Sequence, residues 1–263
     1  MEAHFHQALF ALFGADPSAQ AAANGWLAGF ASTSDAWSAA LGLLNGQTPP
    51  PVAFFCANML LSKARAEWGG LGGDQRQQLH DAVSSKLQEA HAWSGARLVA
   101  GRLAQTLAAM AALSGAEAAS HLLMSAVNAA AGGGGVDTEA SLGLLTALAE
   151  EVDRLEYAKR KALANALLQQ LPPLLSVLQG LLLEAQLAGA TATPVLKCLS
   201  AWLRLEPSGG GGLCVSPGEL RAAAPQLLPA MLRALGTGDS GAGGGVDASE
   251  GLSLGGELAA DLL

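Results

Sequence analysis

Residues 16–68 read DPSAQAAANGWLAGFASTSDAWSAALGLLNGQTPPPVAFFCANMLLSKARAEW, with three tryptophans on three successive apolar patterns. The first pattern opens at Pro17, because proline at the first helical position loses no hydrogen bond. Trp26 and Phe30 follow at helical spacing on one face. This part of the stretch therefore predicts an amphipathic helix.

Two more helices follow after short breaks. Ser34 or Asp35 can cap the second helix, and Asn45-Gly46 ends it. Prolines 49–51 open the third helix, which ends near Trp68. The short breaks predict stacked helical hairpins, in which large apolar side chains pack in the core. With a later helix included, the side chains assigned to the core are Trp26, Phe30, Trp37, Leu41, Phe55, Trp68 and Trp202.

The composition also predicts an all-α fold. The chain has no isoleucine, 5% aromatic and 14% charged residues, so alanine, leucine and glycine must supply most of the packing. Further helical patterns recur so that consecutive pairs begin at the period typical of HEAT or armadillo repeats. We expect an α-α superhelix of about six hairpins, each burying its apolar faces against its neighbours. The further helices predicted are 74–90, 94–113, 116–131, 138–152, 157–170, 172–187, 194–205 and 217–235.

Charge and cysteine content exclude several classes of function. The net charge of −8 disfavours nucleic acid as a partner and favours a basic protein segment. Cys56, Cys198 and Cys214 form no CxxC pair, which argues against a zinc site or a disulfide framework and indicates a reducing compartment. The N-terminus has no basic region before its apolar run, so it predicts a first helix instead of a signal peptide. The uncharged span between Lys161 and Glu184 predicts two helices joined at a proline pair, with no membrane insertion.

The sequence evidence for catalytic, phosphate-binding or metal sites is weaker than that for a structural explanation of the same residues. The glycine runs 132–135 and 209–212 lack the lysine and the preceding strand of a phosphate-binding loop. His4 and His6 could share a metal, but their spacing places them on different sides of a helix. The acidic residues Glu150, Glu151, Asp153 and Glu156 could form a paired-carboxylate or cation site, and a solvated turn is the preferred interpretation.

Leucine motifs at 171–175 and 178–182 match the LxxLL pattern of coactivator helices, but core packing explains them in a leucine-rich helical chain. We therefore predict no catalytic residue, no metal ligand and no cofactor, and a protein that is not an enzyme.

Three stretches carry a resemblance to a known family. They are WLAGFASTSDAWSAALGLL (26–44), VAFFCANMLLSKARAEWGGL (52–71) and DQRQQLHDAVSSKL (74–87). They resemble the N-terminal repeats of the importin-beta, or karyopherin-beta, superfamily, and within it the transportin-SR and importin-thirteen branch. The residues that match in order and with similar gaps are Trp26, Leu27, Phe30, Trp37, Leu44, Phe54, Phe55, Lys63, Trp68, Arg76 and Leu79.

Two later stretches are similar to helices of the same branch. LGLLTALAEEVDR (142–154) resembles a leucine-rich helix, although Ala149 stands where the branch has proline, and VLKCLSAWLRL (195–205) resembles a later helix. The resemblance implies a domain division into a HEAT-repeat solenoid (1–235, importin N-terminal-like and exportin-like), a glycine-rich loop (236–249) and the start of a further helix (250–263). Because family members are far longer, it also implies that the chain is a fragment.

The resemblance further implies a nuclear transport receptor that shuttles between cytoplasm and nucleus. Such receptors bind GTP-loaded Ran, largely through the second helix of each N-terminal hairpin, and they carry protein cargo past nucleoporins. Within the third helix, Asn58, Ser62 and Arg65 form a polar stripe at spacings of four and three, and they are the candidates for partner contact. A merely solvated stripe is the alternative, as is a HEAT-repeat scaffold or adaptor without transport activity. The cargo and the direction of transport are left open.

Overall fold

The computed structural model describes residues 2–93, 95–132, 135–188, 190, 192–205, 214 and 216–237. Within these residues the secondary structure consists of thirteen α-helices and one short 3-10 turn, without a strand. The predicted all-α class is thus confirmed. The chain forms two compact units, residues 1–113 and 114–263.

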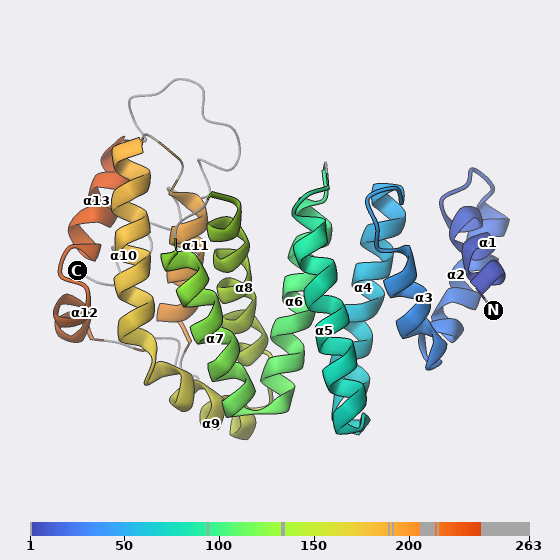
Figure 1. Ribbon diagram of the computed structural model, residues 1–263, viewed down its shortest axis with the longest axis horizontal. Coiled ribbons are helices and arrows are strands. Elements are labelled where there is room, and N and C mark those ends of the chain that lie inside the picture. Colours follow the sequence, from blue (N-terminus) through green and yellow to red (C-terminus); the bar gives the residue numbers. More distant parts are fainter. Residues whose placement is uncertain are drawn as a thin grey trace. The chain divides into compact units, whose positions relative to one another are not determined.

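In the first unit, helices close in the sequence pack in pairs (Figure 1). Asp16 caps one of them, since its Oδ1 accepts a hydrogen bond from the Ser18 amide at 2.9 Å, and Pro17 occupies the first helical position. The helices pack in the pairs α1 with α2 and α3 with α4, as expected for helical hairpins. Their bounds are α1 Glu2–Leu12, α2 Pro17–Ala31, α3 Asp35–Leu43, α4 Pro50–Glu67, the 3-10 turn Trp68–Gly70, α5 Gly73–Ala90 and α6 Arg97–Ser114.

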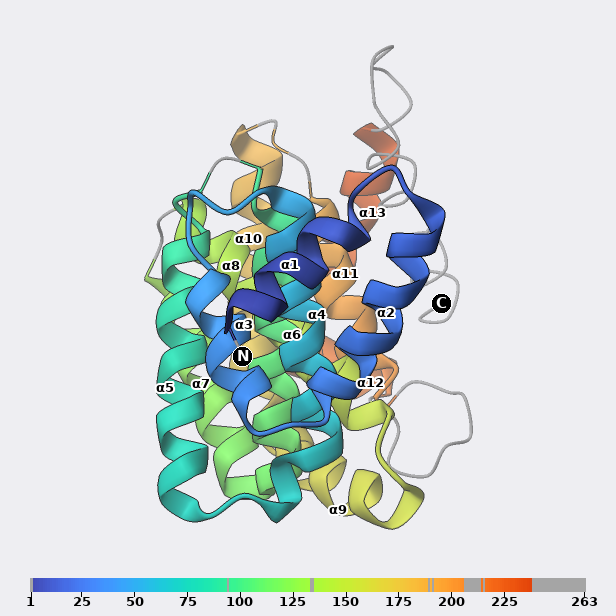
Figure 2. The ribbon, with the colours of Figure 1, turned by 90° about the vertical axis from the view of Figure 1, so that its right-hand side faces the viewer.

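Aromatic rings join α1 to α2, which lie side by side in Figure 2 as well. The rings of Phe5 and Phe30 lie 4.9 Å apart between centroids, and both side chains are buried. Trp26 stacks on Phe30 at 5.1 Å, but 37% of Trp26 is exposed. The prediction that Trp26 belongs to the core is therefore wrong. Helical spacing defines a stripe, but α1 covers only the part of that stripe that holds Phe30.

The other predicted core residues differ in their burial. Trp37, Trp68 and Trp202 are buried, whereas Leu41 and Phe55 are half-buried.

The second unit contains the remaining helices, in which α7 packs on α8 and α9, and α8 packs on α11. Its helices are α7 Ala116–Ala131, α8 Gly135–Asp153, α9 Tyr157–Leu168, α10 Leu171–Ala188, α11 Thr193–Leu203, α12 Pro217–Ala223 and α13 Leu227–Thr237. The single helix predicted for 217–235 is wrong, because the structure breaks it into α12 and α13. Ala224 has φ −144° and ψ 76°, outside the helical region. Pro225 explains the break, since a proline disfavours helical backbone in the residue before it.

The long uncharged span forms two helices, as predicted. α9 ends at Leu168 and α10 begins at Leu171, so the pair Pro172-Pro173 lies in the first turn of α10. By length and composition alone, α10 is apolar enough to cross a bilayer, with a mean hydropathy of 1.3. It packs against α7, α11, α12 and α13, and Leu174, Leu178 and Leu182 are buried. The leucines of both LxxLL matches thus contribute to packing.

Several predictions fall on residues outside the described ones. These are the glycine run 209–212 and the further helix at 250–263. Most of the glycine-rich loop 236–249 lies outside as well, although α13 continues to Thr237. The proposed domain boundaries remain predictions.

Candidate partner-binding site

The polar stripe of α4 lies on an accessible part of the first unit. Ser62 and Arg65 are exposed and Asn58 is half-buried, whereas Met59 and Leu60 on the other side of α4 are buried. Since α3 packs on α4, the stripe belongs to the second helix of a hairpin. The stripe offers an amide, a hydroxyl and a guanidinium, which can bind polar or acidic groups of a protein partner.

A buried ammonium group holds α4 in place next to this stripe. Lys63 is 2% exposed, and its Nζ donates three hydrogen bonds of 2.8 Å, to the carbonyl oxygens of Ala31 and Thr33 and to Glu67 Oε1. The same Nζ lies 5.5 Å from the centroid of the Trp37 ring, and Trp37 Nε1 donates to Glu67 Oε2 at 3.3 Å. An ammonium has three donors, so all of them are satisfied. Lys63 thus fixes the α2–α3 turn to α4.

A second cation of the family-like pattern also serves the fold. Arg76 of α5 donates from Nε to the Trp68 carbonyl at 3.0 Å and from Nη2 to the Gly69 carbonyl at 2.8 Å. Both carbonyls belong to the 3-10 turn that follows α4, so Arg76 ties α5 to this turn. The conspicuous cations Lys63 and Arg76 are therefore structural, and Arg65 is the cation that α4 presents at its surface.

The acidic residues near the end of α8 are more ordered than predicted. Glu150, Glu151 and Asp153 are helical, and Glu151 is only 4% exposed, with Arg154 Nε 3.6 Å from its Oε1. The interpretation of this run as a solvated turn is thus wrong for Glu151. The run of acidic residues suggested a turn, but Glu151 lies on the buried face of α8.

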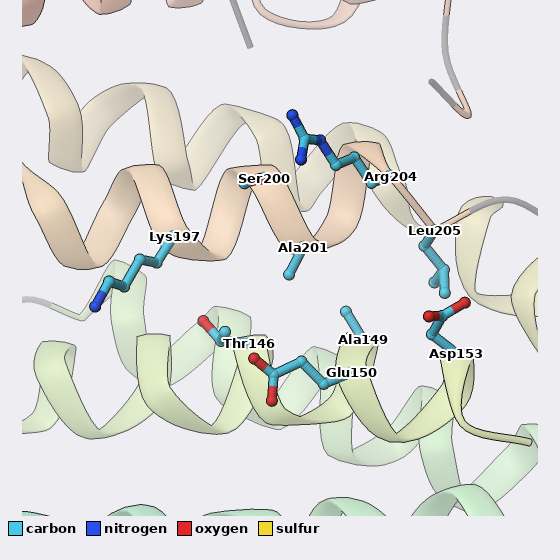
Figure 3. A pocket seen from close by; sticks show the side chains of 9 residues that line it. All are labelled: Thr146, Ala149, Glu150, Asp153, Lys197, Ser200, Ala201, Arg204 and Leu205. Atoms are coloured by element: carbon cyan, nitrogen blue, oxygen red, sulfur yellow. The ribbon is translucent and has the colours of Figure 1, made fainter. Parts of the chain in front are cut away.

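A shallow groove of about 410 Å³ lies between α8 and α11. In Figure 3, Ala149 and Ala201 point toward each other across it, and the carboxylates of Glu150 and Asp153 lie along α8. Lys197 extends from α11 and Arg204 from the position just after it, with the guanidinium of Arg204 directed away from α8 (Figure 3). The groove brings together residues about fifty positions apart, and no local pattern in the sequence could have indicated it.

One hydrogen bond fixes the two walls of this groove. Trp202 Nε1 donates to the Leu145 carbonyl at 2.9 Å, and the indole is fully buried. The bond stabilises the packing of α11 on α8, which sets the width of the groove.

The cysteines and histidines of the described residues form no reactive or metal-binding cluster. Burial raises the pKa of the Cys56 and Cys198 thiols to about 12, so both stay protonated and unreactive at neutral pH. His4 and His6 are exposed on α1. Among the residues that the structure describes, no group of three or more His, Cys, Asp or Glu could hold a metal ion.

The sequence matches one known family. Residues 96–235, which are more than half of the chain, match the exportin 1-like protein family. The chain belongs to the exportin 1-like family. No curated protein matches the sequence.

Membership of the exportin 1-like family agrees with the predicted importin-beta superfamily. Members of that superfamily are transport receptors that shuttle between nucleus and cytoplasm, and they are not enzymes. The match covers α6 to α13 up to residue 235, whereas the stretches that suggested the transportin-SR and importin-thirteen branch lie mostly before it. The branch therefore remains a prediction.

Proposed function

We propose that this exportin 1-like chain acts in a nuclear transport receptor that binds GTP-loaded Ran and carries protein cargo between cytoplasm and nucleus. The observation that carries the proposal is the match of residues 96–235 to the exportin 1-like family. The place of α4 supports the Ran contact, because α4 is the second helix of an N-terminal hairpin and presents exposed Ser62 and Arg65.

The backbone that carries the α4 stripe is already held in place before a partner binds. The bonds of Lys63 to the Ala31 and Thr33 carbonyls hold α4 against the α2–α3 turn, so binding costs little ordering of the backbone. Arg65 can pair with a carboxylate through two parallel hydrogen bonds, which gives direction as well as affinity. Contacts with nucleoporins and shuttling between compartments follow from the same proposal.

A pull-down with immobilised Ran tests the proposal. We expect the chain to be retained by GTP-loaded Ran and not by GDP-loaded Ran. The triple variant Asn58→Ala/Ser62→Ala/Arg65→Glu should lower this retention by at least about tenfold, the loss typical of a contact that includes a buried charge.

A matched control changes the same residue types elsewhere in the first unit. The variant Asn24→Ala/Ser38→Ala/Arg97→Glu alters exposed positions on α2, α3 and α6 and gives the same change in net charge. We expect its retention to match that of the unaltered chain. Equal retention of both nucleotide forms of Ran, or of neither form, would contradict the Ran contact and favour a HEAT-repeat scaffold or adaptor.

A further inference from the structure

Helix α9 begins with an unusual concentration of positive charge. Its first residues are Tyr157, Ala158, Lys159, Arg160 and Lys161, so three of the fourteen Lys and Arg residues of the chain are consecutive here. The chain as a whole has a net charge of −8. We call Tyr157, Lys159, Arg160 and Lys161 the α9 basic cluster.

The cluster is accessible and only partly neutralised. Lys159 and Lys161 are exposed, and neither forms an ion pair with any residue that the structure describes. Arg160 is half-buried and engaged: its Nη1 donates to the Asp153 carbonyl at 3.3 Å and lies 3.4 Å from Asp153 Oδ1, while its buried Nε has no hydrogen-bond partner among the described atoms. Glu156 precedes the cluster, and its side chain makes no capping bond to α9.

An exposed aromatic ring lies close to two of these cations. Tyr157 is 53% exposed, and its ring centroid is 5.9 Å from Arg160 Cζ and 6.0 Å from Lys161 Nζ. The contacts hold both cations near the ring. The cluster therefore combines positive charge with an accessible apolar surface, as binding surfaces for flexible segments commonly do.

The folding of α9 gives no reason for the charges of Lys159 and Lys161. Cations in the first turns of a helix face the positive end of the helix dipole, so they destabilise α9. Arg160 shares the packed face of α9 with Leu163, Ala164 and Leu167 and bonds to Asp153 at the end of α8, whereas Lys159 and Lys161 are exposed and have no such role. Lys159 and Lys161 thus oppose the helix dipole without improving the packing, which indicates a role in binding.

The shape of the cluster indicates the kind of partner. Successive residues of a helix turn by about 100°, so the side chains from Lys159 to Lys161 spread over about 200° of its circumference. A rigid, flat surface can contact only some of them, whereas a flexible chain can follow the end of the helix. We propose that the α9 basic cluster binds a flexible acidic polypeptide segment, whose carboxylates pair with Lys159 and Lys161.

This second surface is separate from the α4 stripe. The α9 cluster belongs to the second compact unit and the stripe to the first, and the binding of an acidic peptide requires neither Ran nor a nucleotide. Failure of one proposal would thus leave the other unaffected.

Fluorescence polarisation with the full chain tests the proposal. The probe is a labelled peptide of alternating Glu and Gly, and the same peptide with Gln in place of Glu is its uncharged counterpart. We expect only the Glu peptide to bind, and Lys159→Gln/Lys161→Gln to weaken it by at least about tenfold. The control Arg97→Gln/Arg221→Gln removes the same charge at two exposed sites, and we expect its affinity to stay within about twofold.

Circular dichroism separates a binding effect from loss of structure. Because Lys159 and Lys161 oppose the helix dipole, their replacement by Gln should keep or raise the thermal stability. Equal weakening by the control pair, equal binding of the Gln peptide, or an unchanged affinity of Lys159→Gln/Lys161→Gln would overturn the proposal. Displacement of the peptide by a lower concentration of single-stranded RNA would overturn it in favour of a nucleic-acid site.

Discussion

Each unit holds its own helices together with a buried hydrogen-bond donor, which is charged in the first unit and neutral in the second. In the first unit, the charged Lys63 donates to Ala31, Thr33 and Glu67 and connects α4 to the α2–α3 turn. In the second, the neutral indole of Trp202 donates once, to the Leu145 carbonyl. Lys63 reaches the carbonyl of Ala31, 32 positions away, and Trp202 reaches the carbonyl of Leu145, 57 positions away. Both bonds therefore join parts of the chain that helical periodicity alone does not connect.

The difference decides how each unit responds to change. A buried ammonium contributes strong bonds but leaves several unsatisfied partners when it is removed. The indole of Trp202 contributes one bond and a large apolar volume, so its removal mainly creates a cavity. The first unit should therefore be sensitive to polar substitutions and the second to substitutions that change volume.

The largest effect is expected for Trp202→Ala. Loss of this fully buried side chain should lower the free energy of unfolding by about 4 kcal/mol, because the cavity adds to the lost transfer energy. Trp202→Phe keeps most of the volume and should cost about half as much. Urea denaturation of the two variants checks the order. An equal loss for both would contradict the view that volume dominates in the second unit.

Lys63→Met comes next, with an expected loss of about 2–3 kcal/mol. Breaking a buried ion pair typically costs about 3–5 kcal/mol, but Glu67 is one-third exposed and can regain water. The matched control is Lys86→Met, which removes a surface pair with Glu89 and should cost at most about 0.5 kcal/mol. Hydrogen exchange should show faster exchange in α2 and α4 for Lys63→Met. Similar losses for both lysines would show that the network contributes little.

The buried thiols predict a loss of stability in alkaline solution. The folded-state pKa of Cys56 and Cys198 is about 12, above the ordinary 9.0, so only the unfolded chain ionises between these values. This contribution is fully present below pH 9 and falls as the pH rises, by about 1.4 kcal/mol per thiol at pH 10. Cys56→Ala and Cys198→Ala should each reduce the slope of stability against pH above 9. An unchanged slope in both variants would contradict the prediction.

The smallest effect is expected for Trp26→Ala. Trp26 is 37% exposed and contacts Phe30 by stacking, so its loss should cost about 1 kcal/mol. Thermal denaturation beside Trp202→Ala gives a direct comparison of two tryptophans in the same chain. A cost for Trp26 near that of Trp202 would restore Trp26 to the core.

Most helices could be predicted from the sequence because their start and stop signals are local. Pro17 and Asp16 begin α2, and the proline pair 172–173 lies in the first turn of α10. The break at Ala224 also had a local signal, Pro225, which the leucine periodicity around it concealed. Core membership was harder to predict, because spacing gives the direction of a side chain but not the extent of the neighbour that covers it. Trp26 shows this limit.

The candidate surfaces show the same division. The α4 stripe could be predicted, since Asn58, Ser62 and Arg65 share a face by spacing alone. The groove between α8 and α11 could not, because it depends on the packing of helices far apart in the sequence. The role of Lys63 was equally hidden: the sequence shows a lysine in a family-like pattern, and only its three bonds show that it is structural.

By itself, the sequence determined the all-α class, most helix boundaries and the superfamily, since these depend on composition, periodicity and short-range motifs. Only the tertiary structure decided which cations serve the fold and which are accessible. Lys63 and Arg76 are bonded to carbonyls at helix ends, whereas Lys159 and Lys161 are exposed on α9. The physical reason is that a lysine or arginine reaches several ångströms, and its partner depends on which distant carbonyl or carboxylate the packing brings near.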